Sequence, residues 1–167
     1  VGPEKNLDLL LTAFAQLVTG DGGFPAEYQE YAKKLRLMIV GTGSAETMLR
    51  QYASDLGIAD QVIFTGAVDY KEIPLYYGAA DLFVMTSTSE VKPLVFLESM
   101  AAGLPVVAVE ASGSGDTFTS GEDGILTPED ADAFAAAVRD LLINQEKRRR
   151  ISQAALKSVK RNSVSNL

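Results

Sequence analysis

The stretch SEVKPLVFLESMAAGLPVV, residues 89–107, decides the fold predicted for this chain. It follows the apolar run Leu82 to Met85, which is typical of a buried strand, and its own apolar residues recur at helical spacing until Gly103. Glu90 is therefore expected in the loop at the carboxyl end of a strand, and Glu98 inside the next helix. In open parallel sheets ligands bind at that edge. Two acids at such a corner could hold neutral hydroxyl groups, such as those of a sugar and a ribose.

Short apolar runs alternate with amphipathic segments along the rest of the chain. Strands are expected at 35–40, 62–64, 82–85, 106–109 and 124–126, and helices at 6–17, 44–56, 70–77, 93–102, 130–143 and 146–159. Asn6 and Ser44 are expected to cap their helices, and Gly57 to end one. This alternation predicts an α/β fold: a Rossmann-like, doubly wound parallel sheet with helices on both faces, in a single domain spanning 1–167.

Composition excludes several classes of function. The chain has 167 residues, of which 47% are hydrophobic and 22% charged, and this suits one globular domain with a substantial core. The formal net charge of −7 argues against a broad nucleic-acid surface, which needs clustered Lys and Arg. The chain contains no Cys and no His, so it can hold neither a disulfide nor a Ser-His-Asp triad.

The ends of the chain and its hydropathy lead to two further expectations. No apolar run has the length of a membrane span and no signal peptide is visible, so a cytoplasmic protein is expected. The abrupt start at Val1 and the end at Leu167 indicate a fragment of a longer, two-domain protein.

Six segments carry a resemblance to a known family. The most specific is the pair Glu90 and Glu98 followed by SMAAGLPVV. The others are, in chain order, PEKNLDLL (3–10), LMIVGTG (37–43), VIFTGAV (62–68), YYGAADLFV (76–84) and GEDGIL (121–126). Together they resemble the C-terminal, donor-binding domain of retaining glycosyltransferases with the two-domain GT-B fold, of the family four or group 1 type. The resemblance covers essentially the whole chain.

The resemblance implies a role for each acid and for one lysine. Glu90 would contact the transferred sugar, Glu98 would hold the ribose, and Lys5 would bind the donor diphosphate, which makes Glu90 and Lys5 the candidate catalytic residues. The family's loop near the sugar-phosphate corresponds here to the segment with Ser114 and Asp116.

The backbone between the two acids is the expected contact for the sugar or the diphosphate. Lys92, Leu94 and Val95 are the donor-binding candidates there, whereas Pro93 has no N–H to donate. A helix that begins at this point presents free amides and the positive end of its dipole, which together suit a diphosphate.

Two loops complete the expected donor site. In the family the base lies against the strand end that corresponds to 66–70, so Val68 and Tyr70 are candidates for base contacts. Gly41 and Gly43 follow a strand and are candidates for a ligand contact or, equally, a plain turn. They do not form a dinucleotide fingerprint, because the third Gly and the later acid are missing.

The predicted function is that of the donor-binding domain of a retaining glycosyltransferase, which transfers a sugar from a nucleoside-diphosphate sugar to an unknown acceptor. No metal or other cofactor is expected, and the helix and Lys5 would stabilise the departing diphosphate. An N-terminal domain would bind most of the acceptor, so the isolated chain should be inactive. Association with a membrane surface is considered only for the full-length protein. The alternative is a non-catalytic Rossmann-like module that binds a nucleotide or a partner; a sugar epimerase of the same fold ranks below both.

Overall fold

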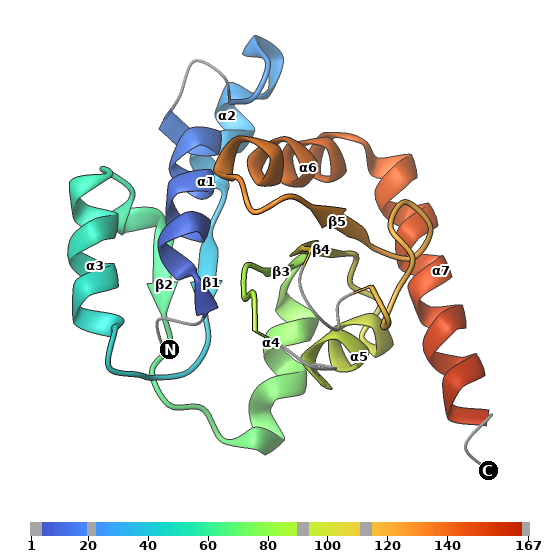
Figure 1. The fold of residues 1–167 in the computed structure, drawn as a ribbon. Coiled ribbons are helices and arrows are strands. Elements are labelled where there is room, and N and C mark those ends of the chain that lie inside the picture. The colour runs from blue at the N-terminus through green and yellow to red at the C-terminus, as the bar shows by residue number, and fades with distance from the viewer. Residues whose placement is uncertain (1–4, 20–22, 90–93, 111–114, 165–167) are drawn as a thin grey trace.

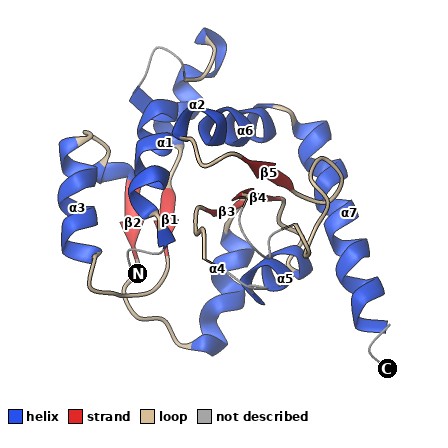
Figure 2. Cartoon of the chain, viewed as in Figure 1, coloured by secondary structure: helices blue, strands red, loops and turns tan. Residues whose placement is uncertain are grey.

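The computed structural model describes residues 5–19, 23–89, 94–110 and 115–164, in which helices and strands alternate (Figures 1 and 2). The strands are β1 (Leu37–Ile39), β2 (Val62–Phe64), β3 (Phe83–Met85), β4 (Val106–Val109) and β5 (Ile125–Thr127). The α-helices are α1 (Leu7–Thr19), α2 (Gln29–Lys34), α3 (Glu46–Asp55), α4 (Ile73–Ala79), α5 (Leu94–Ala101), α6 (Ala131–Ile143) and α7 (Gln145–Val164). Short 3-10 turns are η2 (Ala26–Tyr28), η3 (Ala59–Gln61) and η4 (Tyr70–Glu72).

The described strands form two parallel ladders. β1 pairs with β2, with Leu37 opposite Val62, and β4 lies between β3 and β5. One hydrophobic core joins the two ladders, because Leu37 and Ile39 of β1 belong to the same buried cluster as Val107 of β4. Helix α1 makes this connection, since it contacts both α3 and α6.

Strand β4 shows that helices cover both faces of the sheet. Val107 and Val109 belong to the core cluster that includes α1 and α6, whereas Val106 and Ala108 belong to a second cluster with residues of α5 and α7. Alternate residues of a strand face opposite sides of its sheet. All four side chains are 1% exposed or less, so both faces are closed to water. The expected doubly wound α/β architecture is confirmed.

Some of the observed helix ends agree with those predicted from the sequence, and others do not. Gly57 ends α3 with a φ of +73°, as expected. The expectation that Ser44 caps α3 is wrong, because the N-cap is Ala45, which makes no side-chain bond to the helix. Ser44 lies instead in a turn before the helix, in which the N–H of Glu46 donates to the carbonyl of Gly43 at 3.1 Å. Asp130 caps α6 by accepting from the N–H of Ala133 at 2.8 Å.

Two features were not expected from the sequence. Helix α2 lies in a segment whose sequence pattern predicts no element, and α7 continues to Val164, five residues beyond the expected end. None of the described helices combines the length and the apolar character needed to cross a membrane.

Candidate functional site

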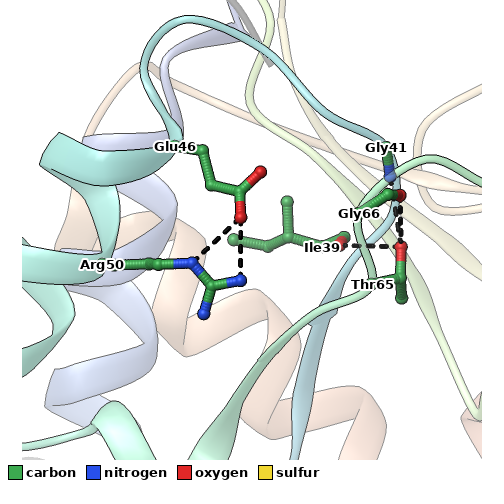
Figure 3. Close-up of polar contacts among 6 residues, drawn as sticks. All are labelled: Ile39, Gly41, Glu46, Arg50, Thr65 and Gly66. Atoms are coloured by element: carbon green, nitrogen blue, oxygen red, sulfur yellow. Dashed lines mark hydrogen bonds and ion pairs between the residues drawn. The ribbon is translucent and has the colours of Figure 1, made fainter.

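The loops that leave β1 and β2 are joined through two glycines (Figure 3). The N–H of Gly41 donates to the carbonyl of Gly66 at 3.1 Å, and the hydroxyl of Thr65 also accepts from it at 3.3 Å. Gly41 and Gly66 have φ values of +106° and +72°, which side-chain-bearing residues rarely adopt. A Cβ at either position would meet no atom within 4 Å. The backbone conformation therefore requires these glycines, and the surface above them is open.

Helix α3 begins after the loop that leaves β1, and its first turn carries an acidic side chain. Glu46 occupies its first turn, where a carboxylate suits the positive end of the helix dipole. Arg50 bonds to this carboxylate at 2.8 Å and lies 4.5 Å from the ring centroid of Phe64 (Figure 3 shows the Glu46–Arg50 contact). The Glu46 carboxylate is therefore already paired with a cation one turn further along α3.

Glu98, in the second turn of α5, is held by two phenol groups. Tyr70 donates its hydroxyl to Oε1 at 2.9 Å, and Tyr77 donates to Oε2 at 3.0 Å. Burial, and then the bond to Glu98, raise the pKa of Tyr77 well above the ordinary tyrosine value, and the bond to Glu98 raises the pKa of Tyr70. The bonds to Glu98 thus favour the protonated form of both phenols, in which their hydroxyls donate.

The structure thus brings together two residues that the sequence assigned separately. Tyr70 was expected near the base and Glu98 at the ribose, which are adjacent parts of a nucleoside, and the two side chains meet although 28 positions separate them. Tyr70 opens η4, whose N-cap Asp69 accepts from the N–H of Lys71 at 2.9 Å. Val68, in the preceding loop, is half-buried.

Lys5 lies at the carboxyl end of β3. Its carbonyl accepts a hydrogen bond of 2.9 Å from the hydroxyl of Thr86, the residue that follows β3. Thr86 is 1% exposed, so this bond fixes the backbone of Lys5 from within the protein. The structure therefore places Lys5 at the edge of the sheet from which the segment before Glu90 also leaves.

The remaining candidates fall into two groups. Glu90, Lys92 and Pro93, together with Ser114, lie outside the described residues. Leu94 and Val95 begin α5, and the N–H groups of a helix's first turn have no acceptor within the helix. The side chain of Leu94 is 70% exposed, so the amino end of α5 lies at the protein surface.

Two surface hollows have neither Glu98 nor the glycine pair in their lining. One, of ≈ 220 Å³, is lined by Asp116, Asp123 and Arg161, among others. The other, of ≈ 330 Å³, lies at the amino ends of β3 and β4 and includes Tyr77 and Arg149 in its lining. In the part of the chain that the structure describes, no group of three or more His, Cys, Asp or Glu side chains gathers as a metal site.

The sequence did not single out Tyr77, Thr65 or Thr86. Tyr70 opens η4 and Tyr77 lies in the following helix α4, and the hydroxyls of both residues bond to Glu98. The adjacent Tyr76 obscured Tyr77, because the sequence does not show which of the two neighbours faces inward.

The chain is similar to known glycosyltransferases. A GDP-mannose-dependent alpha-(1-6)-phosphatidylinositol monomannoside mannosyltransferase of Mycolicibacterium smegmatis is 33% identical over 148 residues, 84% of this chain and 36% of that enzyme. The alpha-monoglucosyldiacylglycerol synthase of Streptococcus pneumoniae is 40% identical over 105 residues, 63% of this chain and 21% of that enzyme. This chain therefore spans well under half the length of either relative.

Solved structures agree with the sequence matches. Anabaena HepE, solved in complex with UDP-glucose, superposes with a TM-score of 0.81 at 25% identity, over 100% of this chain and 47% of that one. The structural neighbours are GT-B glycosyltransferases, which confirms the expected fold. The family described as glycosyl transferases group 1 matches residues 1–158, and the chain belongs to that family.

Proposed function

We propose that this chain is the donor-binding domain of a retaining glycosyltransferase that transfers a sugar from a nucleoside-diphosphate sugar. The observation that carries the proposal is the convergence of Tyr70, Tyr77 and Glu98 beside the amino end of α5. A carboxylate accepts from hydroxyl donors and cannot itself donate, so this group suits a neutral diol rather than a phosphate. The Anabaena neighbour in complex with UDP-glucose supports the same class of ligand.

Each part of the donor would have its own contact. The ribose would bond to Glu98, with the base beside the loop that carries Val68 and Tyr70. The diphosphate would meet the free amides of Leu94 and Val95 and the ammonium group of Lys5. Glu90 would contact the transferred sugar.

The chemistry would rest on stabilising the leaving group. When the bond from the sugar to the diphosphate breaks, negative charge grows on the diphosphate, and the dipole of α5 together with Lys5 would stabilise it. A protein of net charge −7 needs such local positive groups to hold an anionic donor. The chain has no His or Cys to act as a nucleophile. We place most of the acceptor contacts, and therefore the complete activity, with a further domain.

Calorimetric titration of the 167-residue chain with uridine, guanosine and adenosine diphosphates tests this proposal. We expect one of the three to bind, and Glu98→Ala to weaken it by about tenfold or more, as for a lost hydrogen bond to a charged group. Glu27→Ala is the control: it makes the same change in charge at an exposed position of η2 and should leave binding unchanged. Absence of binding by all three nucleotides, or equal affinity after Glu98→Ala, would refute it.

A further inference from the structure

The two tyrosines that bond to Glu98 are held very differently. Tyr77 is half-buried on α4, and its ring lies 6.0 Å from that of Phe83, which in turn lies 6.2 Å from the ring of the buried Phe96. Tyr70 is 75% exposed at the start of the three-residue turn η4. Packing therefore fixes the hydroxyl of Tyr77, whereas the Tyr70 side chain can leave Glu98 with little loss of packing.

The Tyr70 hydroxyl has the chemistry of the ligand proposed for this site. It is a neutral O–H donor bonded to Oε1 at 2.9 Å, as a ribose hydroxyl would be. Since Tyr77 occupies Oε2 from the buried side, Oε1 is the oxygen that Tyr70 covers from the solvent side.

We propose that Tyr70 is a latch on the ribose site: its hydroxyl stands in for a ribose hydroxyl on Glu98 and is displaced when nucleotide binds, while Tyr77 stays and positions the carboxylate. This inference rests on the proposed donor-binding function. Tyr77 is a positioning residue, because it acts on the ligand through Glu98. The proposed latch lowers nucleotide affinity, because the Tyr70 hydroxyl gives up its bond to Oε1 when the ribose hydroxyl takes its place.

Phenylalanine substitutions separate the two roles, because they remove a hydroxyl and keep the ring. Calorimetric titration with the nucleoside diphosphate that wild type binds should show Tyr70→Phe binding about 2- to 10-fold tighter and Tyr77→Phe about 2- to 10-fold weaker, the range of one net hydrogen bond. Tyr76→Phe is the matched control, the same change on the neighbouring residue of α4, and should leave affinity unchanged. Affinity for Tyr70→Phe that is equal to or below that of wild type overturns the latch.

The outcomes distinguish this inference from the function on which it rests. If wild type binds no nucleotide, or Glu98→Ala has no effect, the donor site and the latch both fail. If wild type binds and Glu98→Ala weakens binding, but Tyr70→Phe does not strengthen it, only the latch fails.

A second measurement follows the displacement itself. In wild type labelled with ¹³C-tyrosine, saturating nucleotide should move the ring resonances of Tyr70 toward their positions in nucleotide-free Glu98→Ala protein, where the bond is absent. The Tyr70→Phe and Tyr77→Phe spectra assign the two signals. A Tyr70 resonance that does not change on binding would show that the hydroxyl stays on Glu98.

Discussion

Replacing Gly124 with alanine should destabilise the protein through one contact. Gly124 is buried immediately before β5, and an added Cβ would lie 2.3 Å from Cδ2 and 2.6 Å from Cε2 of Phe118. Carbon atoms pack at about 3.5 Å, so the ring would have to retreat by about 1.2 Å from the 2.3 Å approach. Phe118 is 4% exposed and meets the ring of Phe96 edge-on at a centroid distance of 5.3 Å, which leaves it little room to move.

The expected magnitude combines two opposing terms. Inserting a carbon into a well-packed core destabilises by about 1–3 kcal/mol. Gly124 does not have a positive φ, so alanine fits its backbone and contributes about 0.4–1 kcal/mol in the opposite direction by restricting the unfolded chain. The net loss of unfolding free energy should be about 1–2 kcal/mol. With an m value of about 2 kcal/mol/M, the urea midpoint should fall by roughly 0.5–1 M.

Two comparison variants give the assay its specificity. Urea unfolding followed by far-ultraviolet circular dichroism should show Gly78→Ala gaining about 0.5–1 kcal/mol, since Gly78 lies in α4 with open space around its Cβ. The loss caused by Gly124→Ala should shrink when Phe118→Leu is also present, because the clashing ring is then absent. An unchanged midpoint for Gly124→Ala, or the same loss in the Phe118→Leu background, would refute the reasoning.

Two further predictions concern the bonds around the site. Because the pKa of Tyr77 is raised in the folded protein, the unfolded chain loses this proton first as the pH rises above about 10. The free energy of unfolding should therefore fall more steeply with pH in wild type than in Tyr77→Phe. Equal slopes for the two proteins, measured by urea unfolding at several pH values, would contradict this. Thr86→Val keeps the side-chain shape but leaves the Lys5 carbonyl without this donor. Urea unfolding should therefore show a loss of about 1–2 kcal/mol in unfolding free energy, and calorimetry should show weaker binding of the nucleoside diphosphate. Thr47→Val, the same change at an exposed position, should alter neither quantity.

The fold was predictable because burial leaves a plain signal in this sequence. The run that forms β4 is a continuous apolar segment whose four residues are all buried, and its expected bounds match the structure. The bounds of β2 match as well, although Ile63 in its centre is exposed. Asp130 stands directly before the periodic apolar residues of α6 and caps that helix. Helix α2 left no such signal, because its six residues bury only Ala32. Short polar helices depend on their neighbours in the fold, which a local pattern does not reveal.

The site was predictable only as far as motifs specify single residues. Glu98 and Tyr70 were identified separately, each from its own segment, but their contact depends on how η4 and α4 lie against α5. The sequence alone left the choice between Tyr76 and Tyr77 open. Packing on Phe83 decides it, because it turns the Tyr77 ring inward and so directs its hydroxyl to Glu98.

This arrangement has a consequence for how a carboxylate can serve a nucleotide site in an acidic domain. A free Glu98 would be solvated and mobile, and ordering it when ligand binds would reduce affinity. Tyr77 orders it in advance, because its ring packs on Phe83 and its hydroxyl donates to Oε2. Tyr70 then satisfies the outer oxygen with a donor that is itself solvent-exposed and easily moved. The nucleotide would thus exchange one hydroxyl for another on a carboxylate already in place, so specificity for the ribose would depend on Tyr77 and ease of entry on Tyr70.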